Sequence, residues 1–330
     1  MVHHSFLLWQ PAFIQTRRMM PTTLLNLNEG HGFSGTDTSM LEIAGHLVKR
    51  GHGVHVLSGG PATRRPGHDG ISYMSPDRSY MDDPVQVRTM AAVSTLVLVY
   101  LTPESLGEMA EVMRRASNSR LRVVLWCHSL HLGAHEFEFV KQVCAARGAH
   151  LSVVGVSDFV REKLRPTLEA CGLTGAYITI PNAVNPDLFT GEQGGRVGVR
   201  EPRSMVFFAS YERGGRIAKE VHARLGLRGL AMGGMHVFSY CDASITGLSK
   251  SSLARRLRTC DIFVYPLILD CGSVHHDTFA CVVLEAMASG VLVVTWDVAC
   301  LRGVYGDLIT LVPTPICPGY DPASPVDATL

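Results

Sequence analysis

The stretch HHDTFACVVLEAMASG, residues 275–290, decides the fold of this chain. Asp277 precedes an apolar run that predicts a buried helix, and Glu285 follows eight residues later, two turns into that helix. Buried strands are predicted on both sides of it, at 262–265 and 291–294. A strand, a helix and a second strand make one unit of a parallel sheet, and ligands bind at the carboxyl ends of such strands. Both carboxylates are therefore expected at the mouth of a ligand site.

The same alternation of strand and helix continues along the chain and predicts an α/β protein with doubly wound parallel sheets. In the N-terminal half, short buried apolar runs predict strands at 22–28, 52–58, 95–100, 122–126, 151–156 and 177–180. In the C-terminal half they predict strands at 205–209, 235–240, 262–265, 291–294 and 308–312. Helices are expected between them, among others at 36–50, 158–171, 215–225 and 250–258, with Ser157 and Ser249 as caps.

A segment rich in Gly, Pro and charged residues interrupts this alternation at 185–203 and is interpreted as a linker. The N-terminal Rossmann-like domain is then expected over 22–184 and the C-terminal one, which is short for such a domain, over 204–330. Residues 1–21 lack this pattern and are expected to form a flexible N-terminal extension.

Composition excludes several classes of protein. A hydrophobic content of 46% and a charged content of 18% favour a globular fold. A net charge of +1 gives no indication of binding to nucleic acid. Nine cysteines without a CxxC pair indicate free thiols and a cytoplasmic location. No apolar run reaches the roughly 18 residues that cross a bilayer. A peripheral contact with the cytosolic face of a membrane is left open.

The glycine-rich segment GHGFSG at 30–35 follows the first predicted strand and resembles a dinucleotide-binding loop. An NAD site would place an acid at the end of the second strand, where this chain has Leu57-Ser-Gly-Gly60, whereas Arg64 and Arg65 would suit the 2′-phosphate of NADP. An NADP-linked oxidoreductase and a simple tight turn are therefore two alternatives. The favoured interpretation is a loop that lets a ligand approach the backbone.

Four stretches together resemble the retaining glycosyltransferases of family 4 (group 1), which have the GT-B fold. These stretches are GFSGTDTSMLEIAGHLVKRGHGVHVLS (32–58), VVGVSDFVREKL with YITIPNAVNPDLF (153–189), FFASYERGG (207–215) and YPLILDCGSVHHDTFACVVLEAMASGVLVVTWD (265–297). The resemblance implies two Rossmann-like domains with the active site in the cleft between them. It implies transfer of a hexose from a UDP- or GDP-sugar to an unidentified glycan, lipid or protein acceptor. The nucleotide sugar is a co-substrate, and no metal or other cofactor is expected.

The resemblance also assigns roles within the stretch 275–290. Asp277 takes the place of the first carboxylate of the family signature, near the hydroxyls of the transferred sugar, and is expected to be catalytic. Glu285 takes the second place and would bond the ribose of the nucleotide. The backbone N–H groups at the helix start would face sugar and phosphate oxygens; they belong to Phe279, Ala280 and Cys281.

Three further residues are assigned outside that stretch. Arg213 occupies the place of the phosphate-binding lysine of the family, and Gly35 would leave room for the diphosphate or the acceptor. His128 matches a histidine near the donor sugar and is expected to be catalytic. The chemistry requires such groups, because a breaking sugar–diphosphate bond leaves charge that a cation and helix-end amides stabilise.

The chain departs from the family pattern in ways that favour a second hypothesis. Asp277 is one methylene shorter than the usual Glu and also fits the simpler role of a charge at a helix start. Ala183 and Asn185 replace the commoner Gly and Asp, and the C-terminal half is short. The alternative is a degenerate GT-B protein that binds a nucleotide sugar or a partner without turnover.

Overall fold

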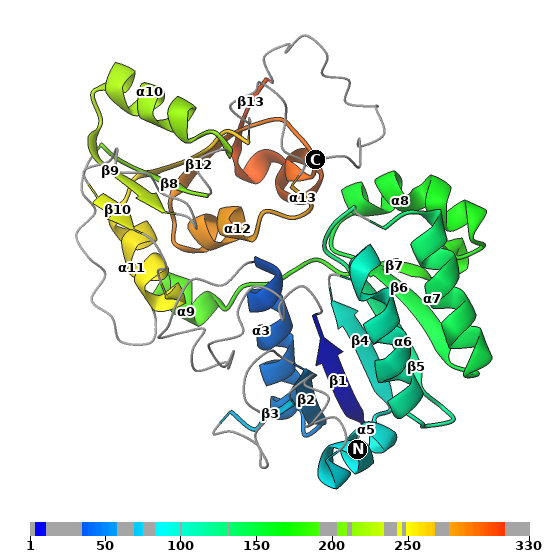
Figure 1. Ribbon diagram of the computed structural model, residues 1–330. Helices are drawn as coiled ribbons and strands as arrows, with labels where there is room; N and C mark the ends of the chain where they lie inside the picture. The colour runs from blue at the N-terminus through cyan, green and yellow to red at the C-terminus, as the bar shows by residue number, and fades with distance from the viewer. Residues whose placement is uncertain are drawn as a thin grey trace. The chain divides into compact units, whose positions relative to one another are not determined.

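The computed structural model describes residues 4–10, 35–57, 69–74, 83–99, 101–130, 132–191, 203–209, 213–233, 243–245, 249–267 and 277–313. Its strands form two sheets, both parallel throughout, and each sheet belongs to its own compact unit (Figure 1). The predicted α/β fold with doubly wound parallel sheets is confirmed. Within the described residues no helix is both long enough and apolar enough to cross a membrane.

The first unit contains a seven-stranded sheet in the order β3-β2-β1-β4-β5-β6-β7. Its strands are β1 (Ser5–Trp9), β2 (Gly53–Leu57), β3 (Ser72–Met74), β4 (Thr95–Val99), β5 (Arg122–Cys127), β6 (His150–Gly155) and β7 (Tyr177–Thr179). Its helices are α3 (Gly35–Lys49), α5 (Pro84–Ala92), α6 (Leu106–Arg115), α7 (Ala134–Ala146) and α8 (Asp158–Ala170), with 3₁₀ turns at Pro103–Ser105 and Thr174–Ala176. Helices α5, α6, α7 and α8 pack side by side in that order.

The N-terminal residues correct one prediction. The segment 1–21 was expected to be a flexible extension, but Ser5–Trp9 is strand β1 near the middle of the sheet, paired in parallel with β2 and β4. Leu7 and Leu8 are fully buried, and each such leucine stabilises the fold by about 1.5–3 kcal/mol. The strand predicted at 22–28 lies outside the described residues.

The second unit contains a six-stranded sheet in the order β10-β9-β8-β11-β12-β13. Its strands are β8 (Ser204–Phe208), β9 (Arg228–Gly233), β10 (Ala243–Ile245), β11 (Ile262–Tyr265), β12 (Leu292–Trp296) and β13 (Thr310–Val312). Its helices are α9 (Pro186–Thr190), α10 (Gly215–Leu225), α11 (Lys250–Thr259), α12 (Cys281–Ala288) and α13 (Leu301–Tyr305), with a 3₁₀ turn at Gly306–Leu308. Part of its core lies where α10 covers β8 and β11, through Met205, Phe207, Ala218 and Val264.

Two segments of the second unit differ from their predictions. The expected linker 185–203 begins with helix α9, which packs against α11 and α12 and buries Phe189. The strand expected at 235–240 lies outside the described residues, whereas β9 and β10 form on either side of it and were not predicted.

The predicted helix caps are confirmed. The hydroxyl oxygen of Ser157 accepts the backbone N–H of Val160 at 3.3 Å, and that of Ser249 accepts the N–H of Ser252 at 3.2 Å. Each cap satisfies an N–H group that the first turn of a helix leaves unpaired. The caps fix the beginnings of α8 and α11, which lie at the carboxyl ends of their preceding strands.

Candidate functional site

The strand order of the second sheet places its ligand-binding edge at β8 and β11. These strands are neighbours, but the chain leaves β8 toward β9 on one side and leaves β11 toward β12 on the other. Open parallel sheets bind ligands at the carboxyl ends of strands where the order reverses in this way. Helix α10 begins after β8 and helix α12 begins after β11. The segments that start these two helices therefore form the candidate site.

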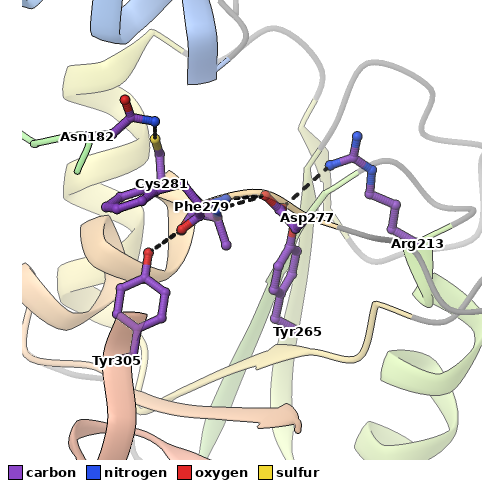
Figure 2. Close-up of polar contacts among 8 residues, drawn as sticks. Asn182, Arg213, Tyr265, Asp277, Phe279, Cys281 and Tyr305 are labelled. Carbon is purple, nitrogen blue, oxygen red and sulfur yellow. Dashed lines mark hydrogen bonds and ion pairs between the residues drawn. The ribbon is translucent and has the colours of Figure 1, made fainter. Parts of the chain in front are cut away.

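Asp277 lies at the centre of this site and connects β11 with the start of α12 (Figure 2). Its Oδ1 atom accepts hydrogen bonds from the backbone N–H groups of Phe279 and Ala280, at 3.1 and 2.8 Å. Its Oδ2 atom accepts a hydrogen bond from the hydroxyl of Tyr265 at 2.9 Å. The carboxylate thus satisfies N–H groups at the positive end of the helix and anchors that end to the sheet.

Arg213 approaches the same carboxylate from the turn before α10. Its Nη1 atom lies 4.0 Å from Oδ2 of Asp277, and the Arg213 side chain is 37% exposed. An ion pair this long and this exposed contributes less than about 1 kcal/mol to stability. The guanidinium is therefore held near the site but remains accessible from solvent, and its planar fork suits the oxygens of a phosphate.

Gly214 fixes the turn that presents Arg213. Its φ angle is 109°, in the left-handed region that favours glycine, and it is the residue just before α10. A Cβ atom at this position would lie 2.8 Å from Cβ of Pro266, which follows β11. Glycine is required here because the two segments approach each other so closely.

The start of α12 is held by a second buried tyrosine. Oη of Tyr305 donates to the carbonyl oxygens of Phe279 and Ala280, at 2.6 and 2.9 Å, and its ring packs edge-on against Phe279. Burial raises the pKa of Tyr305, and burial together with the charge of Asp277 raises the pKa of Tyr265. Both phenols therefore stay protonated and act as hydrogen-bond donors.

Ala280 is strained, and this yields a stability prediction. Its φ and ψ angles are 52° and 58°, a left-handed conformation that costs an alanine about 1–2 kcal/mol but costs a glycine little. We expect Ala280→Gly to raise the free energy of unfolding by about 0.5–1 kcal/mol, after the greater freedom of unfolded glycine is subtracted. Urea denaturation of both proteins measures this change. Ala286→Gly inside α12 is the control and should destabilise by about 1 kcal/mol or more; destabilisation by both would contradict the assignment of strain.

The N–H groups at the helix start differ from their predicted use. Phe279 and Ala280 were expected to direct them at sugar and phosphate oxygens, but in the structure both donate to Asp277. The reason is local, because a side-chain oxygen just before a helix reaches the N–H groups of its first turn readily. The role expected of the N–H group of Cys281 stays a prediction. Its thiol sulfur accepts a hydrogen bond from Nδ2 of Asn182 at 3.5 Å, within the same unit.

Glu285 has a partner that the sequence did not reveal. Its carboxylate forms an ion pair with Nζ of Lys250, the first residue of α11. The Glu285 side chain is 1% exposed and that of Lys250 is 12% exposed. The two residues are 35 positions apart, on different helices, so no periodicity in the sequence connects them. The helix at 250–258 was predicted with Ser249 as its cap, and no role was predicted for Lys250.

The other predicted residues lie on elements whose main part belongs to the first unit. Gly35 is the first residue of α3, and His128 directly follows β5. The ring of His128 packs edge-on against Trp126, with 4.4 Å between ring centroids. Burial lowers the pKa of His128 to about 3, so its imidazole is neutral near pH 7. The roles expected of Gly35 and His128 stay predictions, and residues 30–34 of the glycine-rich segment lie outside the described residues.

The buried His128 predicts a dependence of stability on pH. Below pH 6.5 the unfolded chain binds a proton at this histidine, whereas the folded chain does not until about pH 3. Stability is thus lost as the pH falls, by about 1.4 kcal/mol per pH unit from this group. Between pH 7 and pH 5 we expect the free energy of unfolding to fall about 2 kcal/mol more in the wild type than in His128→Asn. Equal losses in both proteins would contradict this, and His150→Asn, at an exposed site, is the control.

The part of the chain that the structure describes holds no group of three or more His, Cys, Asp or Glu side chains arranged to bind a metal ion.

The candidate site consists of the start of α12 with Asp277, the cation of Arg213, and the ion pair formed by Lys250 and Glu285. Tyr265 and Tyr305, which support Asp277 and the backbone beside it, were not predicted as site residues. Their signal was weak, since an aromatic residue in a strand or short helix usually belongs to the core.

Comparison with protein families finds a match for part of the second unit. Residues 234–318 match the family described as "Glycosyl transferases group 1". The matched segment contains Lys250, Asp277 and Glu285. No curated protein sequence matches the chain. The resemblance to group 1 glycosyltransferases that the sequence motifs indicated is thus confirmed for this segment.

Solved structures show which fold the whole chain resembles. The glycosyltransferase AviGT4, involved in avilamycin A biosynthesis, has a TM-score of 0.56 and 14% identity, over 98% of this chain and 87% of its own. An α-glucosyltransferase in complex with UDP and a 13-mer DNA containing a HMU base has a TM-score of 0.63 and 11% identity, over 94% and 84%. An α-glucosyltransferase with UDP-glucose and DNA containing an abasic site gives 0.59 and 11%, over 95% and 84%. The chain has the GT-B fold of these enzymes.

Proposed function

We propose that this protein is a glycosyltransferase that moves a hexose from a nucleoside diphosphate sugar to an acceptor, with retention of the anomeric configuration and in the manner of family 4. The observation that carries the proposal is the site at the carboxyl ends of β8 and β11. There a solvent-accessible guanidinium, Arg213, faces the start of α12, and α12 lies in the segment 234–318 that matches the group 1 family. This is the edge of the sheet where α/β folds bind nucleotides.

The proposed chemistry follows from the charges of the donor. The bond between the anomeric carbon and the diphosphate oxygen breaks, a bond to the acceptor oxygen forms, and the acceptor proton passes to the departing phosphate. Arg213 stabilises the negative charge that develops on this leaving group. Glu285 accepts a hydrogen bond from the ribose of the nucleotide. The chain has no Asp-x-Asp sequence, and we propose that the reaction needs no metal ion, with Arg213 supplying the positive charge.

The remaining predicted residues complete the proposed site. Asp277 takes the place next to the transferred sugar, while its bonds to the start of α12 shape the backbone there. The N–H group of Cys281 faces the phosphate oxygens. On the side of the first domain, Gly35 leaves room for the diphosphate or the acceptor, and His128 lies near the donor sugar. The acceptor is a glycan, a lipid or a protein, and not a nucleic acid, because the net charge of +1 gives no electrostatic attraction to a polyanion.

Purified protein incubated with UDP-, GDP- and ADP-sugars tests the proposal through hydrolysis of the donor and transfer to candidate acceptors. UDP-glucose is the first donor to try, because an α-glucosyltransferase of the same fold was solved in complex with it.

We expect Arg213→Ala to lower turnover by 100-fold or more. The control is Arg216→Ala, which replaces an exposed arginine one turn away on α10 and should leave turnover unchanged. Equal losses of turnover in the two variants would contradict the proposed role of Arg213 in stabilising the leaving diphosphate. Loss of turnover in the presence of EDTA would overturn the proposal that the reaction needs no metal ion. Transfer of the sugar to a DNA duplex would overturn the proposal that the acceptor is not a nucleic acid.

One observation favours a second function, binding of a nucleotide sugar without turnover. Asp277 already accepts hydrogen bonds from Tyr265, Phe279 and Ala280, so its carboxylate is committed within the protein. Thermal stabilisation by a nucleoside diphosphate, combined with no turnover of any donor, would support this second function. Measurable turnover would exclude it.

A further inference from the structure

The ion pair between Lys250 and Glu285 is the most deeply buried ion pair among the described residues. The Glu285 side chain is 1% exposed and the Lys250 side chain 12%. In each of the other ion pairs of the described residues, the more exposed partner is at least 37% exposed. The pair joins the first residue of α11 to the second turn of α12. It therefore ties together two helices that follow different strands of the sheet.

Stability alone does not account for this pair. Removing two charges from water costs several kcal/mol per ion, and a buried ion pair is often no more stable than apolar side chains of similar size. Lys250 also places a positive charge at the first position of α11, where the helix dipole disfavours it. A lysine in that position is explained better by what it does to Glu285 than by what it contributes to the fold.

The location of the pair agrees with a role in ligand binding. Helix α11 follows β10 and helix α12 follows β11, so both begin at the edge of the parallel sheet where Asp277 and Arg213 lie. Glu285 is eight residues from Asp277 and lies on the helix whose start forms the candidate site.

We propose that Lys250 is a positioning residue of the nucleotide site, which acts through Glu285. By binding Oε1, Lys250 fixes the carboxylate in one orientation, so that Oε2 accepts the hydrogen bond of a ribose hydroxyl. Lys250 also neutralises the negative charge of Glu285, which would otherwise repel the diphosphate of the same ligand. The inference rests on the proposed function and adds the residue that gives the site its preference for ribose.

Isothermal titration with nucleoside diphosphates tests the proposal on the full-length protein. UDP, GDP and ADP are titrated first, and the tightest of them is compared with its 2′-deoxy and 3′-deoxy forms. The variants are Lys250→Met, Lys250→Arg, Glu285→Gln and the double change Lys250→Met with Glu285→Gln. Arg255→Met is the matched control, because it removes one exposed positive charge from the same helix.

We expect the wild type to prefer the ribose form over at least one deoxy form by about 10- to 100-fold, the value of a hydrogen bond to a charged group. Lys250→Met should reduce this preference to less than about threefold, and Lys250→Arg should restore most of it. The double variant should bind like Glu285→Gln alone, because Lys250 acts only through that carboxylate. A purely structural role would lower the melting temperature of Lys250→Met and leave the ribose preference unchanged.

Stability is recorded for each variant, because Lys250→Met leaves a buried carboxylate without its cation. If that variant does not fold, Lys250→Arg and the double variant, which keep the charges balanced, decide the question. An unchanged ribose preference in Lys250→Met, or tighter binding of the diphosphate, would overturn the role of Lys250 and leave the proposed function standing. Absence of binding by any nucleoside diphosphate to the wild type would overturn both.

Discussion

Replacing Asp277 with alanine is expected to destabilise the second unit by about 3 kcal/mol. The change removes the oxygen that accepts the N–H groups of Phe279 and Ala280, which is worth about 1 kcal/mol at a helix start. It also leaves the buried hydroxyl of Tyr265 without its carboxylate acceptor, which costs a further 1–3 kcal/mol or so. Thermal denaturation followed by circular dichroism should show a fall of roughly 5–15 °C in the melting temperature.

Asp277→Asn separates the structural role of this residue from its proposed role beside the sugar. Asparagine caps helices as well as aspartate does, and its Nδ2 group can donate to the hydroxyl oxygen of Tyr265, so the melting temperature of this variant should fall less than that of Asp277→Ala. If the negative charge acts on the sugar, kcat/KM nevertheless falls at least 100-fold in Asp277→Asn. If Asp277 only holds the start of α12, kcat/KM follows stability and falls only in Asp277→Ala. Asp307→Ala, at an exposed position of the same unit, is the control and should change stability by less than about 0.5 kcal/mol.

Replacing Gly214 with alanine is expected to cost about 3 kcal/mol and to displace Arg213. The new methyl group would lie 2.8 Å from Cβ of Pro266, and the backbone φ angle of 109° disfavours any residue except glycine. The start of α10 must then move away from β11, and the guanidinium moves with it. The measurable results are a lower melting temperature and weaker binding of a nucleoside diphosphate.

Gly303→Ala is the matched control for this change. Gly303 lies in α13 of the same unit, and a Cβ atom there would meet no atom within 4 Å. Alanine at this exposed helical position should stabilise by about 0.5–1 kcal/mol. A loss of stability in Gly303→Ala as large as that in Gly214→Ala would show that neither effect comes from the contact with Pro266.

The parts of the fold that the sequence predicted well are those with strong local patterns. Helix α10 was predicted with its observed limits, because a glycine precedes it and a second, left-handed glycine follows it. Strands β5 and β11 were predicted from short apolar runs that are buried in the structure. Some short elements, such as β3 and α13, were missed because three to five residues without a continuous apolar run establish no periodicity.

The candidate site was predictable in its residue types and less so in its contacts. The position of Asp277 directly before a helix followed from the sequence, and the structure confirms it. Its bond to Tyr265 and the pair of Lys250 with Glu285 depend on how separate strands and helices are arranged, and no spacing along the chain specifies that arrangement. Contacts of this kind become visible only when the order of the strands is known.

The position of β1 near the middle of the first sheet restricts where translation of a working protein can start. Met19 and Met20 lie beyond this strand, so a shorter product initiated at either of them would lack it entirely. Strands β2 and β4 would then have no neighbour between them, and the buried row of Leu7 and Leu8 would be absent. Such an isoform could not assemble the first sheet, and an N-terminal deletion that removes only eighteen residues or so would therefore abolish the fold of an entire unit.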